Sequence, residues 1–249
     1  MSGHNKWSTI KHKKGRADAK RGKLFTKIIR EITVSAREGG GDPDANPRLR
    51  AGIASAKTAN MPAENIKRAI QRGTGELPGA TYEEITFEGY GPGGVAVMLE
   101  ILTDNRNRTT PEIRHLFSKH GGNLGENGCV SWLFTRKGSI LVPRSDALNE
   151  DMMMEVSLEV GAEDLDTSDT DYYRIASAPE DLHRIKDALE GRGIEVESAE
   201  LTMEPSATAR LEGKPAQQMI RLMEAFDEHD DVQHVWANFD IDDDILASA

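Results

Sequence analysis

The chain has 249 residues, with 31 Lys and Arg against 42 Asp and Glu and a formal net charge of −11. This length is sufficient for two or three domains, each with its own hydrophobic core. No run of residues approaches the roughly 18 apolar positions of a membrane span, and the N-terminus lacks the apolar segment of a secretory signal. We therefore expect a cytoplasmic protein without a membrane partner. The single cysteine excludes an intrachain disulfide and a multi-cysteine zinc site.

Charge is distributed unevenly along the chain. Residues 1–75, called the head below, hold 17 Lys and Arg and 6 Asp and Glu, so their net charge is +11. Residues 76–249, called the trunk, hold 14 Lys and Arg and 36 Asp and Glu, and their net charge is −22. Such asymmetry indicates a polyanionic partner, and we expect nucleic acid bound in a strongly salt-dependent manner. One alternative stays open, in which the head docks on the acidic trunk of its own chain.

The head begins with a segment that has little apolar periodicity. Residues 1–22 contain two glycines near their end, Gly15 and Gly22, and predict an arm with little structure of its own. Apolar residues then recur at helical spacing from Leu24 to Ala36, which predicts a helix that the glycine run 39–41 ends.

Two shorter helices are predicted to follow in the head. Asn46 and Pro47 are suited to the cap and first position of a helix that runs through about Ala59. A third helix is expected after Pro62 and is closed by Gly73. Three short helices make a small bundle, and the Gly- and Pro-containing segment 73–80 is typical of a linker.

The hydrophobic period changes to two at the start of the trunk. Residues 85–88 alternate between apolar and polar, and "GYGPGG" at 89–94 predicts a hairpin turn. The strand after it, 95–102, is apolar on both faces and therefore predicted to be central. A helix is expected to begin at residues 110–112, and "CVSWLF" at 129–134 is predicted to be a strand.

The rest of the trunk alternates strands with helices. Strands are predicted at 139–142, 173–176, 194–203 and 232–239, and helices around 148–156, 179–190 and 219–226. This order predicts an α+β fold with two sandwiches, each a sheet with helices on one face. The first sandwich lacks a final helix and strand that the C-terminal pair is able to supply. We therefore expect one α+β domain from 76–135 plus 205–249, with a second α+β domain, 136–204, inserted in it.

No catalytic or metal-binding motif is present in the sequence. The Gly-rich segment after residue 88 lacks the Lys-Ser/Thr of a phosphate loop, and neither a Gly-x-Ser-x-Gly nor a His-Glu-x-x-His pattern occurs. His115 and His120 are five residues apart and fall on different helix faces, so we expect no metal site with Cys129, which is predicted to pack in a strand. The acidic segments 166–171 and 240–244 are typical of solvated surface. We expect no enzyme, cofactor or small-molecule substrate.

The densest cationic set lies at the start of the chain. Mobile cationic side chains suit phosphate contacts, which require no sequence readout, and a neighbouring tryptophan is able to stack on an unpaired base. The predicted nucleic-acid-binding residues are Lys11, Lys13, Lys14, Arg16, Lys20, Arg21, Lys23, Lys27 and Trp7. The alternative for Trp7 is a structural role in which it attaches the arm to the helical bundle.

A secondary cationic set is spread over the later helices and one loop. On the second and third helices of the head, it comprises Arg48, Arg50, Lys57, Lys67, Arg68 and Arg72. In the trunk, Arg106, Arg108 and Arg114 lie where a loop meets a helix, an arrangement that suits phosphate. The alternative there is local pairing of these arginines with Asp104 and Glu112.

Several segments closely resemble the YebC/PmpR family. They are "MSGHNKWSTIKHKKGRADAKRGKLFTKIIREI", "NPRLR…AKTANMPAENIKRAIQRG", "FEGYGPGGVAV", "TDNRNRTTPEIRHLFSKHGGNLGENGCVSWLF" and "KG" at 137–138. The resemblance covers nearly the whole chain and is densest before residue 140. It is specific, because "DNRNRT" and "KHGGNLG" are not generic patterns.

The resemblance implies a helical N-terminal domain followed by two α+β domains of ferredoxin-like type, and it supplies no catalytic residues. Members of the family are described as transcriptional regulators that bind DNA. Relatives that include the mitochondrial translational activator of cytochrome c oxidase I act instead in translation, which implies relief of stalling at proline-rich stretches. We therefore expect a regulator of gene expression that binds duplex DNA. The alternatives are a ribosome-associated translation factor that binds ribosomal RNA, and an interaction scaffold without nucleic acid.

Overall fold

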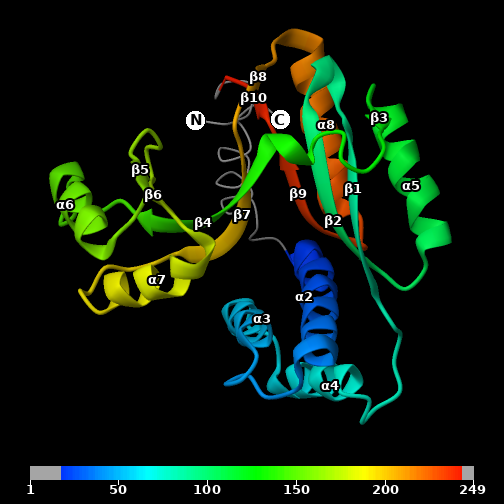
Figure 1. Cartoon of the computed structure of the whole chain (residues 1–249), viewed down its shortest axis with the longest axis horizontal. Coiled ribbons are helices and arrows are strands. Elements are labelled where there is room, and N and C mark those ends of the chain that lie inside the picture. The colour runs from blue at the N-terminus through cyan, green and yellow to red at the C-terminus, as the bar shows by residue number, and fades with distance from the viewer. Residues whose placement is uncertain (1–17, 243–249) are drawn as a thin grey trace.

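The computed structural model describes residues 18–242, with side chains from residue 22 onward, and confirms the α+β fold class (Figure 1). The described part of the head is helical, and the trunk contains two separate four-stranded sheets. In Figure 1 the head lies below the first sheet, and the second sheet lies to the left of both.

Three helices pack together in the head. They are α2 (Asp18–Gly39), α3 (Pro47–Thr58) and α4 (Ala63–Gly73). Ile32 and Leu49 are fully buried between them. Asn46 caps α3 as predicted, because its side-chain oxygen accepts from Leu49 N at 3.0 Å while its amide donates to Ser35 O of α2 at 2.8 Å. One polar side chain thus holds the turn between two helices.

The predicted boundary of the arm is wrong at its C-terminal end. Helix α2 begins at Asp18, four residues before Gly22, whereas residues 18–22 were expected to be unstructured. A glycine costs a helix about 1 kcal/mol but does not end it, and the Gly22 carbonyl accepts from Thr26 Oγ1 within the helix at 3.1 Å. The remainder of the predicted arm lies outside the described residues.

The first sheet has the strand order β3-β1-β2-β9 and is antiparallel throughout. Its strands are β1 (Glu83–Tyr90), β2 (Ala96–Thr103), β3 (Asn123–Leu124) and β9 (Val232–Ala237), and its helices are α5 (Arg106–Lys119) and α8 (Gly213–Glu228). Strand β2 is central, as its two apolar faces predict. Val97 and Leu99 face the core beneath the helices, and Met98 is buried on the other face. Strand β9, near the end of the chain, therefore pairs with a strand from the beginning of the trunk.

The hairpin between β1 and β2 is confirmed. A short 3-10 turn, η1 (Pro92–Gly94), joins the two strands, and Gly93 and Gly94 have φ angles of 72° and 78°. These left-handed conformations favour glycine over residues with a Cβ, which explains why "GYGPGG" predicts the turn correctly.

The strand predicted at 129–134 is wrong. The segment is a loop with a 3-10 turn, η2 (Ser131–Leu133), and the next strand begins only at Phe134. The buried Glu88 carboxylate accepts three backbone N–H groups of this loop, from Gly128, Val130 and Ser131, each at 2.8 Å. Because these donors bind a carboxylate, they do not form a strand ladder. The apolar pattern contains no sign of this distant partner.

Helix α5 also begins earlier than predicted, at Arg106 instead of residues 110–112. Asn105 is the N-cap, and its side-chain oxygen accepts from Arg108 N at 3.1 Å. Pro111 lies inside the helix. Asn105 caps the helix at an earlier position, so Pro111 does not mark its first residue.

The second sheet has the order β5-β6-β4-β7. Its elements are β4 (Phe134–Pro143), α6 (Glu150–Val160), β5 (Asp164–Asp166), β6 (Tyr172–Ser177), η3 (Pro179–Asp181), α7 (Leu182–Glu190) and β7 (Ser198–Pro205). This β-α-β-β-α-β succession is ferredoxin-like, with Ile140, Tyr173 and Ile185 in a core of its own. The predicted strand at 194–203 begins four residues later than expected, at Ser198.

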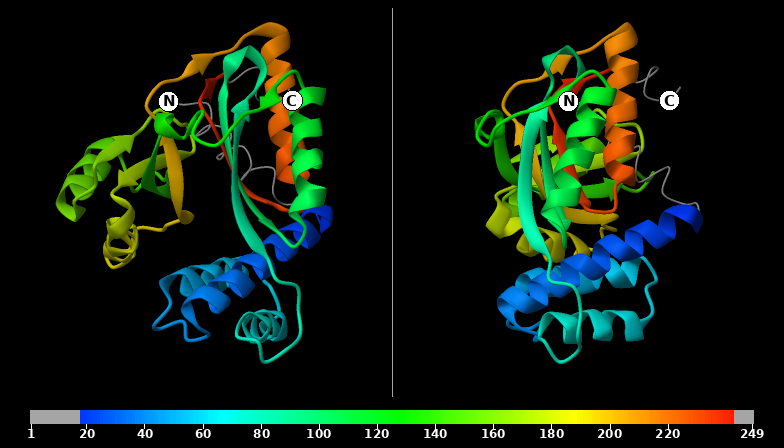
Figure 2. Two further views of the ribbon diagram at one scale, coloured as in Figure 1. Left: turned by 45° about the vertical axis from the view of Figure 1, so that its right-hand side comes forward. Right: turned by 90° about the vertical axis from the view of Figure 1, so that its right-hand side faces the viewer.

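After β7 the chain returns to the first sheet. Strand β8 (Ala209–Arg210) pairs in parallel with β10 (Phe239–Asp240), and α8 and β9 lie between them in sequence. Figure 2 shows α5 and α8 side by side on one face of the first sheet, with the second sheet set apart from it. We propose that domain boundaries follow these sheets: the helical head 1–75, a domain from 76–135 plus 205–249, and an inserted domain 136–204.

Candidate nucleic-acid interface

Most of the primary cationic set lies outside the described side chains. Lys11, Lys13, Lys14, Arg16 and Trp7 fall before residue 18. Lys20 and Arg21 belong to the first turn of α2, where side chains are not described. The structure therefore describes this set from Lys23 onward.

Lys23, Lys27 and Arg30 form one face of α2, and this face contacts the trunk. Lys23 Nζ donates to Glu228 O at 3.0 Å, Lys27 Nζ donates to Asp227 O at 2.9 Å, and Arg30 Nη1 donates to Asp230 O at 2.6 Å. We call these three residues the docking face. The last carbonyls of a helix lack intrahelical partners and carry the negative end of its dipole. Lys23 and Lys27 of the docking face therefore neutralise the C-terminus of α8, and Arg30 binds the segment that follows it.

The contact between the docking face and the trunk includes a buried anion, Asp231. Its side chain is 3% exposed, and Arg30 Nη1 lies 2.6 Å from Oδ1. Its other oxygen accepts from three groups of the trunk, Thr109 Oγ1 at 2.6 Å, Thr103 Oγ1 at 3.0 Å and Arg108 Nη2 at 2.9 Å. Burial alone would raise the pKa of Asp231, but these hydrogen bonds outweigh it and lower the pKa to about 2. The carboxylate thus joins the head, the start of α5 and the start of β9.

Most of the secondary arginines are paired within the chain. Arg48 binds Glu31 and Glu38 of α2 and Glu84 of β1, at 2.7, 3.0 and 2.9 Å. Further pairs are Arg68–Glu64 at 3.1 Å, Arg106–Glu83 at 3.3 Å and Arg108–Asp104 at 3.1 Å, and Arg50 donates to the carbonyls of Pro43 and Asp44. For Arg108, local pairing with Asp104 is therefore present. Glu112 instead binds His229, at 3.1 Å.

Three cations of the head are left without a partner among the described residues. Lys57 of α3 and Lys67 and Arg72 of α4 are exposed, and the described part of the chain holds no ion pair or hydrogen bond to their charged groups. They belong to the two helices that do not carry the docking face. The charges of these three described residues are therefore open to a ligand.

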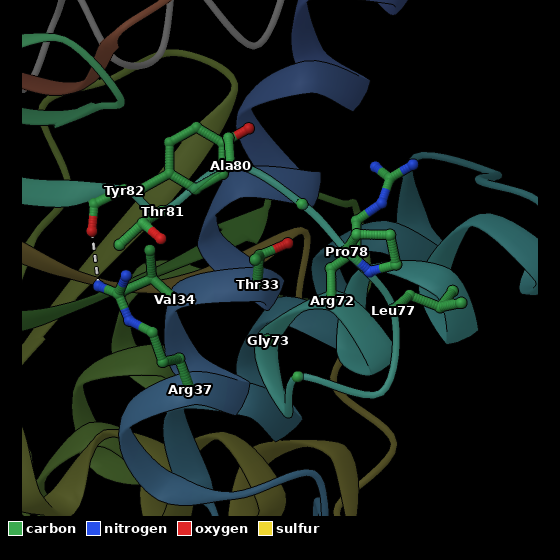
Figure 3. Close-up of a pocket in the computed structure, with 12 residues that line it drawn as sticks. Thr33, Val34, Arg37, Arg72, Gly73, Leu77, Pro78, Ala80, Thr81 and Tyr82 are labelled. Carbon is green, nitrogen blue, oxygen red and sulfur yellow. Dashed lines mark hydrogen bonds between the residues drawn. The ribbon is translucent and has the colours of Figure 1, made fainter.

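A cavity of about 340 Å³ lies where the linker passes α2 and α4 (Figure 3). Arg37 Nη2 donates to Tyr82 O at 2.5 Å across it, and Val34 and Leu77 contribute apolar walls. The stem of Arg72 packs against Gly79, because a Cβ added there would lie 3.1 Å from Arg72 Cγ. Arg37 is thus occupied by the Tyr82 carbonyl, and the cavity has no convergent set of polar groups that would identify a ligand.

The part of the chain that the structure describes holds no cluster of three or more His, Cys, Asp and Glu side chains suited to a metal ion. Cys129 lies in the loop before η2 and not in a strand, which corrects the prediction. Burial and the neighbouring Glu88 raise the pKa of its thiol. Its carbonyl accepts from Tyr90 and Trp132, at 3.0 and 3.1 Å. Between residues 18 and 242 no helix is long and apolar enough to cross a membrane.

Sequence reasoning missed two anions that organise this region, Asp231 and Glu88. Asp231 stands in a run of acidic residues near the C-terminus, and Glu88 alternates with apolar residues as a solvent-facing strand residue would. Neither pattern differs from that of an ordinary exposed acid. For Asp231, the available signal is the pair Thr103 and Thr109 in "TDNRNRT", whose hydroxyl groups are suited to bind a carboxylate.

Two domain profiles of known proteins match this chain. The N-terminal domain of TACO1/YebC proteins matches residues 5–76, and the second and third domains match residues 82–239. The chain belongs to the TACO1/YebC family. This TACO1/YebC protein is 57% identical over 244 residues to a probable transcriptional regulatory protein of Geobacter sp. strain M21, covering 98% of each chain.

Further relatives match this TACO1/YebC protein in sequence and structure over nearly its whole length. A probable transcriptional regulatory protein of Desulfosudis oleivorans is 58% identical over 245 residues, covering 98% of this chain and 99% of the relative. The crystal structure of a conserved hypothetical protein from Aquifex aeolicus superposes with a TM-score of 0.86 at 53% identity, covering 95% and 97% of the two chains. The likeness therefore includes the head and both sheets.

Proposed function

We propose that this protein is a non-enzymatic regulator of gene expression that binds duplex DNA through the head. The observation that carries the proposal is the charge division, +11 on the head against −22 on the trunk. A cationic surface gathers nucleic acid by releasing condensed counterions, whereas an acidic surface repels it. The trunk would then orient the complex by keeping nucleic acid away from most of its surface. The names of the relatives, probable transcriptional regulatory proteins, support a regulatory role.

Docking on the trunk does not remove this function, because the two roles use different side chains. Lys23, Lys27 and Arg30 face the trunk, whereas Lys57 and Lys67 have no partner among the described residues. We assign the phosphate contacts to the arm and to α3 and α4, that is, to Lys11, Lys13, Lys14, Arg16, Lys20, Arg21, Lys57, Lys67 and Arg72. The docking face supports the interaction-scaffold alternative in one respect, because it holds the head against the trunk.

Removal of cations from the arm tests the proposal. In the variant Lys13→Ala, Lys14→Ala, Lys20→Ala and Arg21→Ala, we expect weaker binding to duplex DNA and a salt slope reduced by up to about 0.9 per lost contact. The melting temperature should stay nearly unchanged, because exposed charges each contribute under about 1 kcal/mol to stability. A gel-shift or anisotropy titration at several salt concentrations measures both quantities. An unchanged salt slope would overturn the proposal.

The ribosomal alternative is tested beside it. The same variant and the wild-type protein are sedimented with ribosomes at increasing salt. Retention of the wild type on ribosomes, with no shift of duplex DNA at the same salt, would favour a translation factor that binds ribosomal RNA. Binding to duplex DNA without ribosome retention would favour the transcriptional role.

A further inference from the structure

Two segments of the acidic trunk that include parts of the helices α5 and α8 contain no acidic residue, and segments 89–99 and 127–145 are also free of them. Residues 113–125 and 213–223 hold no Asp or Glu, although the trunk as a whole has 36. The first segment covers the second half of α5 and the loop after it, and the second covers the first two-thirds of α8. Figure 2 shows these helices side by side on the outer face of the first sheet. Folding thus brings the two acid-free segments together.

Basic side chains from both helices lie on this outer face. His115 and Lys119 lie one turn apart on α5, and Lys214 and Arg221 lie two turns apart on α8, which places each pair on one side of its helix. All four are exposed, as is Arg114. We call Arg114, His115, Lys119, His120, Lys214 and Arg221 the α5–α8 basic surface.

The centre of this surface is the loop at the end of α5. Gly121 has a φ of 85°, and a Cβ added to it would lie 3.4 Å from Gln218 Nε2 of α8. The loop therefore packs against the helix turn that precedes Arg221. His120 lies in the same place: its burial and the neighbouring Lys119, Arg221 and His115 lower its pKa. Groups from the two helices are thus close enough to act on one imidazole.

These charges are not neutralised by the described residues of the trunk. Arg114, Lys119, Lys214 and Arg221 make no ion pair with any residue in the described range, whereas Arg184, Arg192 and Arg210 elsewhere in the trunk are each paired with an acid. Four acids flank the two segments in sequence. Glu112 binds His229 at 3.1 Å, and Glu212 binds Arg210 at 3.1 Å. Glu126 and Glu224 form no ion pair with any residue in the described range.

The remaining side chains of this surface suit a phosphate backbone better than a protein. Protein interfaces have an apolar centre, but none of the large exposed hydrophobic residues of the described chain lies on α5 or α8. Instead, Ser118 and Gln217 are exposed between the cations and supply neutral donors. Interfaces with nucleic acid are polar and positively charged in this way.

We propose that the α5–α8 basic surface is a second site for the phosphate backbone of nucleic acid, located on the trunk. This inference rests on the proposed function and extends it, since the ligand would contact both the head and one face of the trunk. The acidic remainder of the trunk then limits contact to that face.

Full-length variants test the inference. The first is Lys119→Gln, Lys214→Gln and Arg221→Gln. Its control, Lys186→Gln, Arg192→Gln and Arg210→Gln, removes the same charge from ion-paired surface sites elsewhere on the trunk. With a short fluorescent duplex DNA as the probe, we expect the first variant to bind about tenfold more weakly and to lose up to about 2.7 from the salt slope. The control should bind nearly as the wild type does. The charge-conserving variant Lys119→Arg, Lys214→Arg and Arg221→Lys should retain binding, and unchanged melting temperatures would show that all variants fold.

The arm variant described above separates the two proposals. If the arm variant loses affinity while the first variant and its control behave alike, the second site is overturned and the proposed function stands. If the first variant alone loses affinity, the second site stands and binding through the head is overturned. Wild-type protein that does not bind the duplex at low salt would overturn both.

Discussion

Asp231 connects more of the molecule than any other single side chain considered above. Removing its charge would leave the guanidinium of Arg30, which is 13% exposed, without its anionic partner. Removal of one partner from a buried ion pair typically costs 3–5 kcal/mol. For Asp231→Asn, which keeps an acceptor for the two threonines, we expect a loss of about 3 kcal/mol in the free energy of unfolding, measured with urea. The control Asp230→Asn alters an exposed neighbour and should change it by under about 0.5 kcal/mol.

The lowered pKa of Asp231 predicts that the stability of the protein depends on pH. The pKa of Asp231 is about 2 in the folded protein, against roughly 3.9 in an unfolded chain. A lowered pKa contributes stability that is fully present above about pH 4 and is lost as the pH falls toward 2. The stability difference between the wild type and Asp231→Asn should therefore be constant near neutral pH and shrink below pH 4. A difference that does not change down to pH 2 would contradict this assignment.

Cys129 is predicted to be unreactive. Burial and Glu88 raise the pKa of its thiol, so little thiolate is present at neutral pH. We expect iodoacetamide to alkylate the native protein about tenfold more slowly than the urea-unfolded chain. Cys129→Ser should leave DNA binding unchanged, because no base or metal cluster surrounds the thiol in the described residues. Loss of function in a folded Cys129→Ser protein would reopen the enzymatic interpretation.

At the scale of elements, the contact between α2 and the end of α8 determines how the head is held. Lys23 and Lys27 donate to the last carbonyls of α8, and a cation at a helix C-terminus contributes about 0.3–1 kcal/mol. For Lys23→Ala with Lys27→Ala, we expect a loss of about 1–2 kcal/mol in stability and faster proteolysis of the linker 73–80. Affinity for DNA should be unchanged or higher, because the docked cations do not contact the ligand.

A matched pair of substitutions on the other helices serves as its control. Lys57→Ala with Lys67→Ala removes the same charge from α3 and α4, where neither side chain has a partner among the described residues. This variant should keep its melting temperature and lose affinity. If the two double variants show the reverse pattern, the division of the head into a docking face and a binding face is wrong.

At the scale of the whole molecule, docking and nucleic-acid binding should respond differently to salt. The docking face binds backbone carbonyls and a buried carboxylate, which salt screens weakly. Phosphate contacts release counterions, so five contacts would give a salt slope of about −4.5. Between 50 and 200 mM salt, we expect the radius of gyration in solution scattering to stay constant while DNA affinity falls by two orders of magnitude or more. Expansion of the free protein over this range would show that the head is held by screened surface charges instead.

Several features of the fold depend on local sequence chemistry and are therefore predicted from the sequence. The apolar spacing that begins at Leu24 predicts α2, Asn46 predicts the start of α3, and the glycines of "GYGPGG" predict the hairpin. Each depends on backbone preferences within a few residues, so the neighbouring sequence is sufficient. The unequal charge of head and trunk and the family motifs are likewise properties of the sequence alone.

The features that the sequence does not predict depend on long-range contacts. The loop at 126–133 is not a strand because Glu88, about forty residues away, binds its N–H groups. Lys27 belongs to the docking face because folding brings it to Asp227, 200 residues away, and the α5–α8 basic surface exists only because two distant helices lie side by side. Sequence determined how many cations this protein has and where they cluster along the chain. Only the tertiary structure decided which of them are paired, because pairing depends on the positions of acids and carbonyls that are remote in sequence.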